Sequence, residues 1–131
     1  MVTLDQVSEL AARLPGTTEA VDARTGARGW SVGGKAFAWE RPFSKADLKR
    51  FGSEPPPGGP IVAIRVADLG EKEAVLAVGR AGFFTIPHFD GYSAVLVQLQ
   101  EVHLPDLREV LEDGWLSRAP RQLADEYLAD R

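Results

Sequence analysis

The chain contains no cysteine, only two histidines and one methionine among its 131 residues. The absence of cysteine excludes disulfide bonds, thiolate catalysis and metal sites with sulfur ligands, and it suits the reducing cytoplasm. No apolar run approaches the roughly 20 residues of a membrane span. The first ten residues, MVTLDQVSEL, lack the basic and apolar regions of a signal peptide, so we expect none. We therefore predict a cytoplasmic protein that has no membrane partner.

Basic residues are also in the minority, 15 against 19 acidic ones, but they are unevenly distributed. The segment 24–50 carries seven basic and two acidic residues, so the remainder of the chain is strongly acidic. A protein with this balance binds polyanions poorly overall, but the basic segment can still hold an anion locally. The length fits a single domain, 1–131, and 44% hydrophobic residues suffice for a core.

Capping residues and apolar periodicity predict five helices. Thr3 and Gln6 form a capping box before an apolar face, and Ser44 with Asp47 repeats that pattern. Asp68 opens a third helix that ends near Gly79. The expected helices span residues 3–14, 44–51, 68–79, 104–117 and 120–128.

Alternating and apolar segments predict a sheet between these helices. Gly33-Gly34 is a two-residue loop that joins the strands 28–32 and 35–40, and Asp90-Gly91 joins 83–89 to 92–99. The segment 61–66 is apolar almost throughout and should be a central strand, and 19–23 is a weaker strand. We predict an α+β fold, a two-layer sandwich whose mainly antiparallel sheet of five to six strands carries the N- and C-terminal helices.

The first hairpin gives the best candidate for a binding surface. Pairing through the glycines sets Trp30 opposite Phe37 and Arg28 opposite Trp39, with Lys35 at the turn, all on one face. Rings interleaved with cations can stack planar groups and neutralise phosphates. Alternatively the rings belong to the core, and the two cations extend from its ends to solvent. The opposite face carries small residues, so we expect a helix to lie close to it.

In order and spacing, four segments resemble the MmcQ/YjbR family of small bacterial proteins: GWSVGGKAFAW, VADLGEKEAVL, FFTIPHFDGYSAVLVQL and LREVLEDGWLSRAP. The Gly34-Lys35-Ala36-Phe37 stretch and the Pro87-His88 pair before a hairpin are typical of that family. The resemblance implies an α/β sandwich similar to the frataxin (CyaY-like) fold. Such proteins have been described as a double-wing arrangement and are often given a DNA-binding label. The resemblance implies no catalytic residue.

His88 permits several interpretations. Hairpin pairing places His88 opposite Ser93, an arrangement in which the serine could be a nucleophile and the histidine its base. However, Ser93 does not lie in the G-x-S-x-G elbow that marks such a serine. His88 and His103 do not lie at a spacing typical of metal ligands, and we expect no metal and no cofactor. The acidic residues Glu109, Glu112 and Asp113 suit a solvated helix face, although the frataxin-like fold suggests iron. We expect His88 to be a partly buried ring, bonded to nearby backbone, that borders a cleft without serving as its base.

The helix at 44–51 adds a second basic element. Lys45 and Lys49 lie four residues apart on one face, near Arg41, and the N-terminus capped by Ser44 can hold an anion. A solvated helix face explains the same pattern. The chain has neither the G-x-x-x-x-G-K-[ST] nor the G-x-G-x-x-G motif, so it lacks the usual nucleotide cradles.

We therefore predict a binding module without catalysis, a monomer or a small homo-oligomer. Its basic segment is expected to bind DNA or another polyanion weakly and in a salt-sensitive manner. The alternative is a domain that binds a small molecule or a protein in a cleft near His88, with weak enzymatic activity as an open option. The candidate binding residues are Arg28, Trp30, Lys35, Arg41, Lys45, Lys49 and His88.

Overall fold

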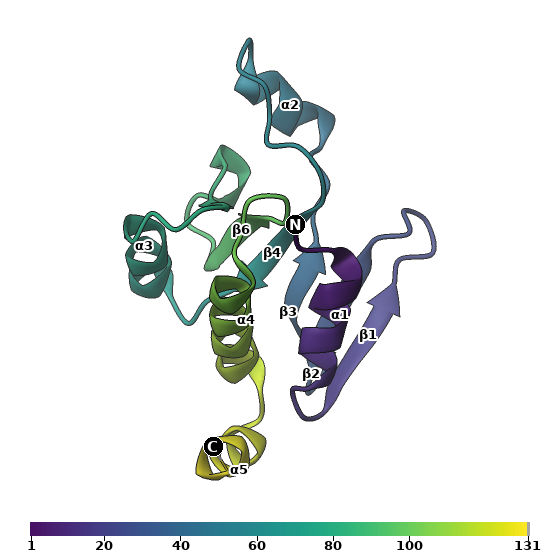
Figure 1. Cartoon of the computed structure of the whole chain (residues 1–131), viewed down its shortest axis with the longest axis vertical. Coiled ribbons are helices and arrows are strands. Elements are labelled where there is room, and N and C mark those ends of the chain that lie inside the picture. Colours follow the sequence, from purple (N-terminus) through teal and green to yellow (C-terminus); the bar gives the residue numbers. More distant parts are fainter. Residues whose placement is uncertain (131) are drawn as a thin grey trace.

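Six strands form one antiparallel sheet in the order β1-β2-β3-β4-β6-β5 in the computed structural model, which describes residues 1–130 (Figure 1). The strands are β1 Thr17–Val21, β2 Arg28–Val32, β3 Lys35–Glu40, β4 Ile61–Arg65, β5 Phe83–Phe84 and β6 Ala94–Gln98. The helices are α1 Leu4–Ala12, α2 Lys45–Phe51, α3 Leu69–Ala77, α4 Leu104–Arg118 and α5 Arg121–Ala129, with the short 3-10 helix η1 at Pro87–Phe89. The predicted α+β sandwich with an antiparallel sheet is confirmed.

The helices begin where their capping residues predict. The Thr3 hydroxyl accepts from the Gln6 amide at 3.2 Å, and the Gln6 side chain accepts from the Thr3 amide at 2.9 Å. The Asp68 carboxylate accepts from the Glu71 amide at 2.8 Å. These bonds satisfy amide groups that a helix start leaves free, which is why short-range sequence signals located the helices correctly.

One face of the sheet is covered by α1 and α4 and holds most of the core (Figure 1). Trp30 of β2, Phe37 of β3 and Trp115 of α4 are its largest buried side chains. Gly114 lets α4 approach the sheet, because a Cβ there would lie 2.9 Å from both the Arg65 carbonyl oxygen and Ile64 Cγ2. The prediction that a helix lies close to the small-residue face of the first hairpin is wrong, because Trp30 and Val32 of β2 face the helix layer and, of the small residues, only Ala38 belongs to that core.

The register of the first hairpin also differs from the prediction. Trp30 pairs with Ala38, and the next pair is Ser31 with Ala36, so Phe37 is an extra residue in a β-bulge. The bulge shifts the alternation of β3 by one residue. Phe37 and Ala38 both face the helix layer, whereas Trp39 belongs to the opposite side of the sheet. The expected single face of interleaved rings and cations is therefore not formed.

The second hairpin is shorter than expected. Only Phe83 and Phe84 pair with β6, after which the chain leaves the sheet and forms η1. Asp90 (φ −59°, ψ 130°) and Gly91 (φ 74°) make a type II turn, closed by a 3.0 Å bond from the Tyr92 amide to the Phe89 carbonyl. The predicted pairing of His88 with Ser93 is wrong. Over residues 1–130 no helix combines the length and apolar character needed to cross a membrane.

Candidate functional site

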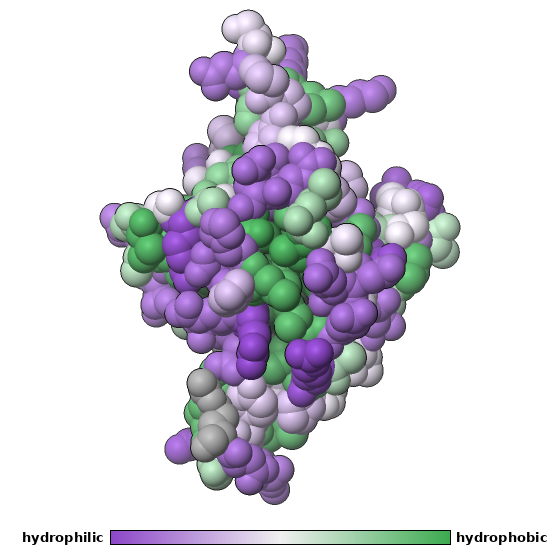
Figure 2. Space-filling model, in the orientation of Figure 1, coloured by the Kyte–Doolittle hydropathy of each residue, from purple (hydrophilic) through white to green (hydrophobic). Residues whose placement is uncertain are grey.

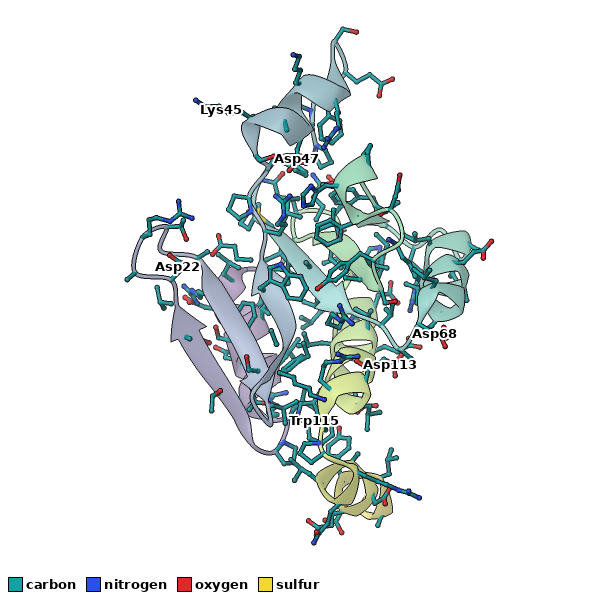
Figure 3. The ribbon with its side chains drawn as sticks, turned by 180° about the vertical axis from the view of Figure 1, so that it is seen from behind. Asp22, Lys45, Asp47, Asp68, Asp113 and Trp115 are labelled. Carbon is teal, nitrogen blue, oxygen red and sulfur yellow. The ribbon has the colours of Figure 1, made fainter. Side chains whose placement is uncertain are left out.

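The face of the sheet opposite α1 and α4 carries a second, smaller apolar cluster, which is the near side in Figure 3. Beside this cluster lies a cavity of about 330 Å³, lined by Trp39, Arg41, His88, Phe89 and Tyr92. We call it the aromatic cavity. Its residues come from β3 and the turn that follows it, and from the η1 segment some 50 residues later in the chain. The cavity thus exists only because the sheet brings these two segments together.

The Tyr92 ring contacts both other rings of the aromatic cavity edge to face. The ring centroids of Phe89 and Tyr92 are 5.5 Å apart at an interplanar angle of 87°, and those of Trp39 and Tyr92 are 6.3 Å apart at 61°. This geometry is the one that aromatic quadrupoles favour, and it fixes the rings relative to one another. Phe89 is buried, Trp39 is half-buried and Tyr92 is exposed, so the cavity offers an apolar wall with an accessible ring at its edge.

Arg41 supplies the positive charge of the aromatic cavity. Its guanidinium carbon lies 5.6 Å from the centroid of the Phe89 ring, a cation–π contact. One of its nitrogens is 3.0 Å from Asp47 Oδ2, and the Asp47 side chain is buried. This ion pair connects α2 to the cavity and orients Arg41, which is itself only half-buried.

The Asp47 carboxylate is held in its charged form by these partners. Burial alone raises its pKa, but the hydrogen bonds from Ser44 and the guanidinium of Arg41 outweigh burial, and the pKa lies below the ordinary value of 3.8. Arg50 approaches Asp47 Oδ1 to 3.8 Å from the next turn of α2. Two arginines therefore share one buried carboxylate, and the cluster keeps a net positive charge beside the cavity.

Lys72 of α3 stabilises the turn that carries the rings of Phe89 and Tyr92. This lysine is buried, and its Nζ donates to the carbonyl oxygens of Phe89 at 2.6 Å and Tyr92 at 2.8 Å. Burial lowers the pKa of the Lys72 ammonium group, and the carboxylate of Asp90 offsets this only in part. Because no strand pairing supports the turn, these two bonds fix the wall of the cavity.

Two of the predicted binding residues, Arg41 and His88, meet in the aromatic cavity. His88 borders it, as expected, but the prediction of a partly buried, locally bonded ring is wrong. The ring is exposed, and within residues 1–130 its nitrogens have no hydrogen-bond partner. The reason is that η1 turns this side chain out of the sheet, where a strand would have directed it toward its neighbours.

Arg28 and Trp30 have structural roles and lie away from the cavity. Arg28 pairs with Asp5 at 2.8 Å and donates to the Ser8 hydroxyl at 3.2 Å, which joins β2 to α1. Trp30 is buried, and its indole N–H donates to Glu19 at 2.7 Å. Trp30 is therefore a core residue, as in the second of the two interpretations of the first hairpin.

The remaining predicted residues lie at two distant places. Lys35 begins β3 beside the Gly33-Gly34 turn, whereas Lys45 and Lys49 lie on α2, beyond the other end of that strand. Six residues of strand span about 20 Å, so these lysines do not form one continuous patch. Figure 1 shows α2 projecting from the body, and Figure 3 shows Lys45 pointing outward and Asp47 inward.

Tyr92, Phe89 and Lys72 were not predicted as parts of a site. The sequence carries no signal for them, because the Asp90-Gly91 pair suits a hairpin turn as well as the type II turn that ends strand pairing here. Arg65 was also missed; its guanidinium carbon lies 4.7 Å from the Tyr92 ring centroid and supports that ring outside the cavity. Among the residues that the structure describes, no group of three or more histidine, aspartate or glutamate side chains could hold a metal ion.

The fold places the chain in the class of α+β domains with a six-stranded antiparallel sheet. No family model matches the chain. It is 46% identical over 133 residues to "Uncharacterized protein Rv2570" of Mycobacterium tuberculosis and to "Uncharacterized protein Mb2600" of Mycobacterium bovis. Each match spans 99% of this chain and 98% of the relative. The chain therefore belongs to the family of these mycobacterial proteins.

A crystal structure of a protein from Pseudomonas syringae is similar in fold. The TM-score is 0.64, and the match covers 88% of this chain and 99% of that chain at 14% sequence identity. At this level of identity the likeness shows a shared fold alone.

Proposed function

We propose that this chain is a binding module and that the aromatic cavity is its ligand site. The observation that carries the proposal is the convergence of one guanidinium and three rings, from distant parts of the chain, on a single cavity. Ligand sites typically combine apolar walls with a few placed polar groups. Arginine recognises carboxylate and phosphate groups, and the rings suit a flat apolar body. The ligand is therefore a planar molecule with an anionic group.

The exposed ring of His88 supports the same assignment. Its nitrogens have no partner within residues 1–130, so they are available to a ligand at the mouth of the cavity. A ring nitrogen that carries a proton donates a hydrogen bond, so His88 can contact the anionic group of the ligand.

A thermal-shift screen of nucleotides and aromatic acids tests the proposal, because a ligand that binds only the native state raises its stability. Calorimetric titration of the strongest hit then measures the affinity for three variants. Tyr92→Ala should weaken binding about tenfold through lost ring contact, and His88→Asn should weaken it less. His103→Asn is the matched control, an exposed histidine before α4. Equal binding by Tyr92→Ala and wild type would place the ligand elsewhere.

We propose polyanion binding through α2 as a second candidate function, because one observation favours it. Lys45 and Lys49 are exposed on a helix that projects from the body, and within residues 1–130 neither forms an ion pair (Figure 1). The double variant Lys45→Glu/Lys49→Glu should abolish binding to labelled duplex DNA at low salt, and wild-type binding should fall steeply with salt. Lys35→Glu, at the far end of β3, is the control. Binding that survives the double substitution would exclude this surface.

The resemblance to the MmcQ/YjbR family supports a binding role without adding a residue to either site. Membership in that family, cytoplasmic location and the state of a monomer or small homo-oligomer remain predictions. Cell fractionation and analytical ultracentrifugation test the last two.

A further inference from the structure

A second cavity lies on the helix-covered face, between α1, α4 and α5. Its volume is about 130 Å³, and its floor is formed by the leucine side chains of Leu10, Leu14 and Leu111. Tyr127 of α5 forms one wall. Figure 2 shows the corresponding hydrophobic strip between α1 and α4, bordered on both sides by hydrophilic residues. We call this the α1–α4 cavity.

Two arginines line the α1–α4 cavity, Arg13 at the end of α1 and Arg108 on α4. Both are exposed, and among residues 1–130 neither is engaged in an ion pair. The acidic residue of the lining, Glu112, accepts a hydrogen bond from the Tyr127 hydroxyl at 2.5 Å. The cavity thus presents an apolar floor, two available guanidinium groups and one carboxylate that is already bonded.

We propose that the α1–α4 cavity binds a small aliphatic carboxylic acid. The chain of the ligand lies on the leucine floor, and its carboxylate pairs with Arg13 and Arg108. An apolar cavity of about 150 Å³ accommodates a benzene molecule, so a cavity of about 130 Å³ suits a chain of about six carbon atoms. The positive balance of the rim selects an acid over a neutral molecule of the same length. This proposal is independent of the aromatic cavity, which lies on the other face of the sheet.

Hexanoate is the probe, and hexan-1-ol is its neutral counterpart of equal chain length. Both are titrated into protein with labelled leucine methyl groups and followed by NMR. Hexanoate should shift the methyl signals of Leu10, Leu14 and Leu111, and hexan-1-ol should bind at least about tenfold more weakly. The double variant Arg13→Gln/Arg108→Gln should weaken hexanoate by at least about tenfold and leave hexan-1-ol unchanged. Leu10→Trp should fill the cavity and abolish binding of both.

Two matched controls separate this site from others. Arg24→Gln removes an exposed arginine from the β1–β2 loop and should leave hexanoate affinity unchanged. Tyr92→Ala should also leave it unchanged, so that failure of the aromatic cavity and failure of this site give different results. Equal affinity for hexanoate and hexan-1-ol, or shifts confined to other methyl groups, would overturn the proposal. So would self-association in the ultracentrifuge that Leu10→Trp removes, because the strip would then be an interface between copies.

Discussion

Replacement of Lys72 by methionine tests whether this buried cation fixes the wall of the aromatic cavity. Methionine fills a similar volume but removes both bonds from Nζ, to the carbonyl oxygens of Phe89 and Tyr92. Hydrogen bonds from a charged donor contribute about 1.5–3 kcal/mol each, or about 3–6 kcal/mol for the pair. Burial of the ammonium group, which lowers its pKa, offsets part of this. We expect a net loss of about 2–3 kcal/mol, which is about 7–11 °C in Tm for a chain of this length.

Urea unfolding followed by circular dichroism measures the change in the free energy of unfolding. Hydrogen exchange of the Tyr92 amide reports on the turn itself, because this amide donates to the Phe89 carbonyl at 3.0 Å. Lys45→Met is the matched control, since Lys45 is exposed on α2. A Lys72→Met protein with wild-type stability and unchanged protection of the Tyr92 amide would refute the reasoning.

The effect of Lys72→Met on the free energy of unfolding should depend on pH in alkaline solution. Since the pKa of Lys72 is lowered from 10.5 in the folded state, the unfolded chain binds more protons between the folded pKa and 10.5. The free energy of unfolding of the wild type should therefore rise relative to Lys72→Met as the pH increases through that interval. Below the folded pKa the burial penalty is fully present, and the difference between the two proteins should be constant.

Two further substitutions test the packing around the sites. Asp47→Asn should cost about 2–4 kcal/mol, because it removes the ion pair with Arg41 and weakens the cap of α2. The lowered pKa of Asp47 means that its contribution is present above pH 3.8 and is lost as the pH falls through the folded pKa. Acid titration of stability should show this loss in wild type and not in Asp47→Asn. Gly114→Ala should cost about 1–3 kcal/mol, since the new methyl group would meet Arg65 and Ile64 at 2.9 Å. Gly70→Ala on α3 is the control: a Cβ there would meet no backbone atom, only Asp68 Oδ1 at 3.3 Å, so the free energy of unfolding should change by less than about 1 kcal/mol. A Gly114→Ala protein as stable as the wild type would contradict the close approach of α4.

Capping residues and glycines in the sequence determined where the helices begin and where the Gly33-Gly34 turn lies. Thr3, Ser44 and Asp68 each bond an amide three residues later, and Gly33 and Gly34 both have positive φ, as their turn requires. These signals act within four residues, so they can be read without knowledge of the fold. They were sufficient to predict the α+β class and the arrangement of terminal helices on an antiparallel sheet.

Only the tertiary structure decided which side chains meet in the aromatic cavity. The bulge at Phe37 reverses the face of Trp39, and no residue of that strand marks it in the sequence. The Asp90-Gly91 pair is compatible with a hairpin turn or a type II turn. Lys72 stabilises the type II turn, because it donates to carbonyl groups 17 and 20 residues further along the chain. Contacts of such long range depend on the positions of whole elements, whereas caps and turns depend on a few neighbouring residues. For this reason the sequence placed Arg41 and His88 among the candidates, and the fold alone joined them to Trp39, Phe89 and Tyr92.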